Sequence, residues 1–193
     1  MKGENRMTQL TAKNMSRELI YRLAVAYVDR YASFDVTDKL CDEYSISKQT
    51  FYRVLGKAIV EGIVGDDTAL IMAEKAKANT EMKVGKKGVA RTKRRYFHLM
   101  EQRKTYQFPK KEATLWTMKY ADSELDKKEF CIRNRITTKL FDRTVRTAIV
   151  EDWVLDEVVE KLKSKSLARF SDEKTKQFWQ KLEQLRNENK NHK

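Results

Sequence analysis

Two stretches of this chain, ninety residues apart, carry the same residues at corresponding positions. Residues 40–64 read LCDEYSISKQTFYRVLGKAIVEGIV, and residues 130–154 read FCIRNRITTKLFDRTVRTAIVEDWV. The alignment needs no gap, and the positions that match a residue ninety places later are Cys41, Ile46, Phe51, Arg53, Ala58, Ile59, Val60, Glu61 and Val64. Self-similarity at a fixed spacing indicates two copies of one supersecondary unit. This duplication limits the possible folds more than any other feature of the sequence.

Both copies have the hydrophobic spacing of helices. The chain of 193 residues contains six glycines and one proline, so few positions interrupt a helix. Apolar residues at i, i+3, i+4 and i+7 predict a helix from Ser16, and Ser47 is expected to cap the start of another. The expected helices span residues 16–31, 38–44, 47–61, 66–78, 110–121, 126–134, 137–152 and 156–170. The predicted fold class is therefore all-α.

The repeated stretch meets the requirements of a helix-turn-helix. The first helix of that motif needs a small residue, here Cys41, so that the second helix can cross it closely. The turn needs a residue that tolerates an unusual backbone, here Ser45, followed by an apolar residue, here Ile46. Phe51 and Leu55 supply the buried side of the second helix. The opposite side of that helix is then left available for the major groove of DNA.

A resemblance to known regulators follows from these residues. ISKQTFYRVL at 46–55 resembles the turn and recognition helix of TetR-type regulators, and the stretch through EGIV at 61–64 is similar to winged-helix regulators. The resemblance covers about 25 residues in each copy. Residues 65–80 depart from the winged pattern because they have the spacing of a helix instead of strands. We therefore carry over only the tandem helix-turn-helix motif, of a kind also found in mobile genetic elements.

The resemblance implies which residues face DNA. In the first copy they are Ser47, Lys48, Gln49, Tyr52 and Arg53. Arg and Lys can bond guanine, Gln can bond adenine, and Ser and Tyr can bind phosphates near the start of the helix. In the second copy the matching residues are Thr137, Thr138, Lys139, Asp142 and Arg143, with Arg146 one turn later. We expect Arg53 and Arg143 to be the most important single residues.

The second copy fits DNA less well than the first. Asn134 and Arg135 replace residues of the turn, and the carboxylate of Asp142 would repel phosphate. Two interpretations stay open: the second copy reads a different sequence, or it binds protein.

The charge of the chain indicates a polyanionic partner. The formal net charge is +13, and residues 81–111 contain eleven basic residues and two acidic ones. Gly85 and Gly88 are expected to make the first half of this segment flexible. A basic linker that is only solvated is one interpretation. Between two helix-turn-helix units we instead expect phosphate contacts, from Lys93, Arg94 and Arg95.

These features divide the chain into five parts. The prediction is two helix-turn-helix domains related by the repeat and joined by a basic linker. The expected parts are a flexible N-terminus at 1–15, a first helix-turn-helix domain at 16–80, a basic and partly helical linker at 81–108, a second helix-turn-helix domain at 109–170, and a C-terminal helix and tail at 171–193. One side of that last helix carries Phe178, Trp179, Leu182 and Leu185, a stripe expected to pack internally or to form a homodimer.

Other classes of protein find little support. The two cysteines are expected to be buried free thiols in a reducing cytoplasm, and His98 and His192 lack the spacing of metal ligands. No glycine-rich phosphate loop, nucleophile elbow or catalytic histidine arrangement occurs, so neither an enzyme nor a cofactor is expected. No apolar run reaches membrane-spanning length.

Two functions remain at this stage. The preferred hypothesis is a sequence-specific protein that binds double-stranded DNA and regulates transcription. The alternative is an inhibitor or adaptor from a phage or plasmid that binds a nucleoprotein machine, as anti-CRISPR proteins do. A binder of the first kind shifts a DNA duplex on its own, whereas an inhibitor acts only with its target present.

Overall fold

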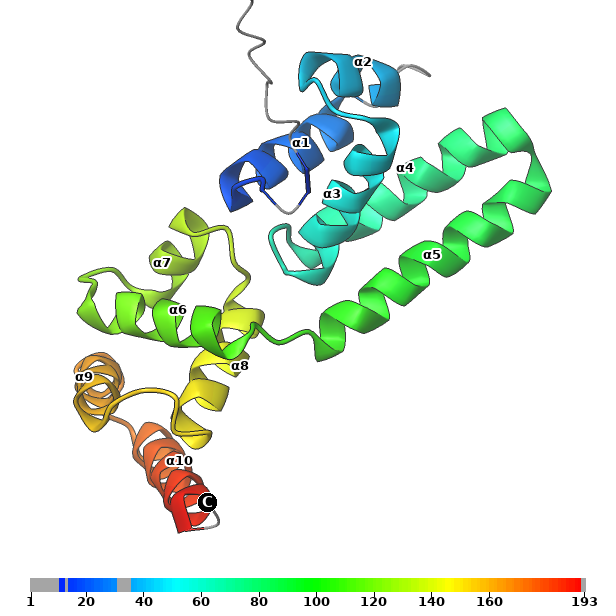
Figure 1. Ribbon diagram of the computed structural model, residues 1–193. Coiled ribbons are helices and arrows are strands. Elements are labelled where there is room, and N and C mark those ends of the chain that lie inside the picture. Colours follow the sequence, from blue (N-terminus) through cyan, green and yellow to red (C-terminus); the bar gives the residue numbers. More distant parts are fainter. Residues whose placement is uncertain (1–10, 13, 31–35, 192–193) are drawn as a thin grey trace, which may run out of the picture. The chain divides into compact units, whose positions relative to one another are not determined.

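A computed structural model describes residues 11–12, 14–30 and 36–191 of the chain. Across these residues all regular structure is α-helical, which confirms the all-α fold class (Figure 1). Most of the expected N-terminal part, at 1–10 and 13, lies outside the described residues, as do 31–35 and 192–193. The chain divides into two compact units, which are described separately below. Unit 1 comprises residues 1–106 with 134–136, and unit 2 comprises 107–133 with 137–193.

The described residues of unit 1 form five helices. They are α1 (Arg17–Asp29), α2 (Val36–Glu43), α3 (Lys48–Val60), α4 (Asp66–Val84) and α5 (Lys86–Thr105). Helix α3 lies against α1, α2 and α5, so it is the central element of the unit. Phe51 of α3 is fully buried, as predicted, and contacts the edge of the Tyr27 ring with centroids 5.6 Å apart.

Local chemistry sets the ends of these helices. The hydroxyl oxygens of Ser16 and Ser47 accept hydrogen bonds from the backbone N–H groups of Leu19 and Thr50. The predicted cap at Ser47 is confirmed, and the helix expected to begin near Ser16 is capped by that residue. Helix α2 ends where Ser45 takes a positive φ of 50°. The next N–H, that of Ile46, then reaches back to a carbonyl of α2. This turn directs the chain from α2 into α3.

The segment expected as a basic, partly helical linker with a flexible first half is helical over most of its length. Helix α4 continues past residue 78 to Val84, and the chain turns back at Gly85, whose φ is 75°. Helix α5 then packs along α4 (Figure 1). A Cβ on Gly88 would lie 2.8 Å from the Thr80 side chain, so glycine permits the close approach of the two helices. The two glycines therefore allow a tight helical hairpin where the sequence led us to expect a flexible segment.

Unit 2 also contains five helices. They are α6 (Lys110–Asp122), α7 (Lys127–Arg133), α8 (Thr138–Val150), α9 (Asp156–Leu167) and α10 (Glu173–Asn191). Aromatic rings fill the space between α6, α7 and α8, where Phe141 lies edge-on to Tyr120 with centroids 5.1 Å apart. Phe141 is 1% exposed, which confirms its predicted burial.

The C-terminal helix α10 closes the core of unit 2. Trp179 and Leu182 are buried among residues of α8 and α9, whereas Phe178 and Leu185 stay partly exposed. Two residues of the stripe, Trp179 and Leu182, therefore pack internally, which was one of the two roles expected for the stripe. A homodimer formed through α10 could bury only the other two apolar residues of the stripe, Phe178 and Leu185.

Candidate nucleic-acid interface

The first half of α3 presents the residues that sequence analysis assigned to DNA. Lys48, Gln49 and Arg53 are exposed, and Tyr52 is 38% exposed. Ser47 caps the helix, so its hydroxyl oxygen is already engaged with the backbone. The exposed side of α3 therefore offers cationic, amide and phenol groups over about two turns.

An acidic neighbour modifies this surface. The ammonium of Lys48 forms an ion pair with Asp38 of α2, with N and O 2.7 Å apart. The hydrogen bond that Lys48 donates to Asp38 raises the pKa of Lys48 and lowers the pKa of Asp38. Because both side chains are largely exposed, water competes for the pair, and Lys48 can exchange Asp38 for another anion at small cost.

Helix α5 brings the most basic segment of the chain to α3. Arg95 donates a hydrogen bond of 3.1 Å to the backbone carbonyl of Tyr52, and its guanidinium lies 5.2 Å from the centre of the Tyr52 ring. Lys93 and Arg94 precede it on α5 and are exposed. Tyr52 and Arg95, which are more than forty positions apart in the sequence, thus meet at the surface of unit 1.

Arg103 has a different environment from the other cations of this segment. Its guanidinium donates hydrogen bonds to the carbonyls of Ile59, at 2.9 Å, and Val64, at 3.0 Å, and pairs with Asp66 at 2.8 Å. Its side chain is only 11% exposed, and burial lowers its pKa. Arg103 therefore ties α5 to the end of α3 and the start of α4, and it is not available to phosphates.

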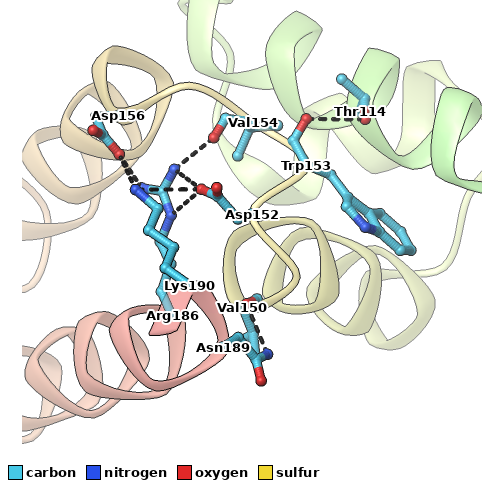
Figure 2. A network of polar contacts seen from close by, with 9 residues as sticks. All are labelled: Thr114, Val150, Asp152, Trp153, Val154, Asp156, Arg186, Asn189 and Lys190. Atoms are coloured by element: carbon cyan, nitrogen blue, oxygen red, sulfur yellow. Dashed lines mark hydrogen bonds and ion pairs between the residues drawn. The ribbon is translucent and has the colours of Figure 1, made fainter. Parts of the chain in front are cut away.

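Unit 2 contains an arginine with an equivalent arrangement. Figure 2 shows Arg186 of α10 between the carboxylates of Asp152 and Asp156, with an additional hydrogen bond of 2.6 Å to the carbonyl of Val154. Burial raises the pKa of Asp152, but the bonds from Arg186 outweigh this effect and lower it. Lys190 adds a second cation, 3.2 Å from Asp156. This network fixes α10 to the loop that follows α8.

The expected DNA-facing residues of unit 2 are less accessible than those of unit 1. Thr138 and Lys139 at the start of α8 are exposed, but Thr137 and Arg143 are half-buried. Arg53 and Arg143 occupy identical positions of the sequence repeat, yet only Arg53 is fully at the surface.

Two further contacts alter the same side of α8. Asp142 forms an ion pair with Lys127, with atoms 3.0 Å apart, which compensates the acid that was expected to repel phosphate. The guanidinium of Arg146 lies over the ring of Phe178 in α10, 5.5 Å from its centre. The second half of this helix side therefore faces α10.

The cysteines are buried free thiols, as predicted. Burial raises the pKa of Cys131 to about 12, and burial also raises the pKa of Cys41.

In the described part of the chain, no three acidic, histidine or cysteine side chains form a cluster that could hold a metal ion. Of the helices in residues 14–30 and 36–191, none combines the length and hydropathy needed to cross a bilayer.

Comparisons with family models, with curated proteins and with solved structures found no match to this chain. The assignment of these surfaces therefore depends on their geometry and charge.

Proposed function

We propose that this chain binds double-stranded DNA and regulates transcription, with α3 of unit 1 as the helix that reads bases. The observation that carries the proposal is the bond from Arg95 to the Tyr52 carbonyl. It joins the exposed side of α3 to the cationic side of α5 in one unit. A helix that enters the major groove needs such flanking cations, because phosphates lie along both edges of the groove.

The residues on α3 suit base recognition. The N-terminal residues of a recognition helix make the base contacts in helix-turn-helix proteins. Arg53 can donate two hydrogen bonds to guanine, and Gln49 can exchange two hydrogen bonds with adenine. Lys93, Arg94 and Arg95 would supply charge to phosphates, which strengthens binding to any sequence.

We also propose that the whole five-helix unit is duplicated, beyond the 25 residues that align. Arg103 bonds the carbonyl of Val64 and the carboxylate of Asp66, and Arg186 bonds the carbonyl of Val154 and the carboxylate of Asp156. The acceptors are ninety residues apart, and both arginines come from the fifth helix of their unit. This equivalence supports the pairing of α1 to α5 with α6 to α10.

In this proposal the two units contribute unequally. Unit 1 combines an exposed Arg53 with the cations of α5, whereas in unit 2 Arg143 is half-buried and Arg146 faces Phe178. We therefore assign sequence readout to unit 1. Unit 2 keeps Thr138 and Lys139 for a weaker second contact, which would increase affinity through its high effective concentration.

The first test measures sequence readout. Duplexes selected by the purified protein from a random pool would be used in fluorescence anisotropy with the Arg53→Ala variant. We expect a loss of about 1–3 kcal/mol of binding free energy on the selected duplex and a smaller loss on random duplex. Arg22→Ala is the matched control, because Arg22 is an exposed arginine whose charge is already paired with Glu18. An unchanged sequence preference in Arg53→Ala would contradict the assigned role.

The second test measures the phosphate contacts. Replacing Lys93, Arg94 and Arg95 by Gln should lower affinity for all duplexes and reduce the log–log salt slope by about one per lost contact. If the variant binds random duplex as the wild type does, α5 plays no part in binding. If the wild type shifts no duplex at low salt, DNA binding fails and the inhibitor hypothesis is left.

A further inference from the structure

Unit 2 contains a cavity of about 330 Å³ between its helices α8, α9 and α10. Its inner wall is apolar and includes Phe141, Ile149, Leu162, Trp179 and Leu182. Cavities that hold small organic ligands have volumes from about 300 Å³ upwards and are mostly apolar with a few polar groups. The size and lining of this cavity are therefore those of a small-molecule site.

The polar groups of the cavity are mainly cations. Lys127, Arg146, Lys165 and Arg169 line it, and its one carboxylate, that of Asp142, is paired with Lys127. Arg146 and Arg169 are exposed. The carboxylate of Asp126 lies near enough to Arg169 for the guanidinium to help lower the pKa of Asp126, but the cations at the cavity still outnumber the nearby carboxylates. The charge of the cavity is thus complementary to an anion.

Lys165 adds positive charge at a less exposed position. Its ammonium donates hydrogen bonds to the carbonyls of Tyr120, at 2.8 Å, and Ser123, and it lies 4.1 Å from the centre of the Tyr120 ring. Burial lowers the pKa of Lys165, and the charge of Arg169 lowers it further. An anion placed near these two side chains would reduce that repulsion.

Trp179 supplies a hydrogen-bond donor. Its side chain lines the cavity and is 5% exposed, and its indole N–H is buried with no hydrogen-bond partner among the described residues. An unpaired buried donor is costly, so most such groups in proteins have a partner. Because this N–H has almost no accessible surface, a ligand's acceptor atom would bond to it after a small shift of the indole ring.

A second cavity lies at the corresponding place in unit 1. It has a volume of about 260 Å³ and is lined by Tyr27, Thr37, Tyr52 and Tyr96, among others. Thr37 and Tyr52 lie ninety residues before Lys127 and Asp142, which line the cavity of unit 2. A cavity thus lies beside the fifth helix of each unit, but the cavity of unit 1 has more hydroxyl groups in its lining, together with the cations Lys83 and Arg95.

We propose that the cavity of unit 2 binds a small amphipathic organic anion. Its apolar body would lie against Phe141, Leu162 and Trp179, and its anionic group would bind Arg146 and Arg169. This inference stands independently of DNA binding, because the proposed binding residues belong to unit 2 and the residues assigned to base readout belong to unit 1.

The probe for this site is 8-anilinonaphthalene-1-sulfonate, an aromatic sulfonate whose fluorescence rises in apolar surroundings. We expect saturable binding of one equivalent to the full chain, measured by fluorescence titration. N-phenyl-1-naphthylamine has the same aromatic skeleton without the sulfonate, so comparing the two isolates the contribution of the charge.

Three variants identify the site. Arg146→Gln combined with Arg169→Gln should weaken sulfonate binding about tenfold and leave binding of the neutral amine unchanged. Trp179→Phe should weaken sulfonate binding about fivefold through the lost N–H donor. Ser166→Phe places a ring in the cavity and should remove binding of both probes. Lys181→Gln is the control, since Lys181 is an exposed cation of α10 outside the cavity.

Circular dichroism on each variant would verify that the helices are intact. Sulfonate binding that is unchanged in the double arginine variant, or reduced equally by Lys181→Gln, would overturn the proposal. So would binding of several equivalents with no effect of Ser166→Phe. If Ser166→Phe does not fold, the double variant and the control still decide the question, because all of their replaced side chains are exposed.

Discussion

Replacing Arg103 by Met tests whether a buried cation holds the basic helix α5 in place. The variant keeps an unbranched apolar side chain but removes the hydrogen bonds to Ile59 and Val64 and the ion pair with Asp66. Hydrogen bonds from a charged donor contribute about 1.5–3 kcal/mol each. Relief from burying the guanidinium charge offsets part of this loss, and Asp66 is 64% exposed, so its pairing adds little.

We therefore expect the free energy of unfolding to fall by about 2–4 kcal/mol. With a urea m-value of about 2 kcal/mol/M, the midpoint would shift by about 1–2 M. Arg94→Met is the matched control on the same helix, and because Arg94 is exposed its effect should stay within about 0.5 kcal/mol.

Two spectroscopic signals separate the two units in this experiment. All three tryptophans, Trp116, Trp153 and Trp179, belong to unit 2, whereas far-ultraviolet circular dichroism reports helices of both units. Arg103→Met should shift the circular dichroism curve, and Arg186→Met should shift the tryptophan fluorescence curve. If Arg103→Met unfolds within about 0.5 kcal/mol of the wild type, the anchoring role of Arg103 is refuted.

Two further predictions concern the cores and the thiols. Phe141→Ala should cost about 3–5 kcal/mol of stability in thermal or urea unfolding, because its ring is fully enclosed, and a negligible shift would contradict its burial. Cys131 should react with a water-soluble thiol reagent much more slowly in the folded chain than in urea, since burial raises its pKa from 9.0 to about 12. The folded chain then retains the thiol proton more tightly than the unfolded chain does, so the stability contributed by this group is intact below pH 9 and declines as pH rises toward 12. A thiol that reacts equally fast in both states would refute this.

Much of the local structure was predictable from residue patterns. The apolar spacing that placed Phe51 and Phe141 in cores acts within one helix, and the cap at Ser47 forms between residues three apart. The burial of Cys41 followed from the need for a small residue at the helix crossing. These predictions succeeded because each depends on neighbours in the chain.

In the basic segment, residue patterns did not predict the tertiary structure. Its glycines were expected to give flexibility, but flexibility depends on what lies across from each glycine. Gly88 faces Thr80 of α4 so closely that it permits a packed hairpin. The sequence alone also does not distinguish Arg95 from Arg103. Arg95 lies at the surface beside Tyr52, whereas Arg103 is buried against two backbone carbonyls.

The candidate site also combines features that the sequence determines with features that only the tertiary structure determines. The residue types, the repeat and the net charge of +13 identify a cationic all-helical chain and name Arg53 and Arg143 as equivalent. Tertiary packing then makes them unequal, leaving Arg53 exposed and Arg143 half-buried. A charge in a sequence has no defined surroundings until helices distant along the chain meet. Helices α5 and α10 supply those surroundings when each folds back on its own unit, and the cavity beside Trp179 arises from the same contact.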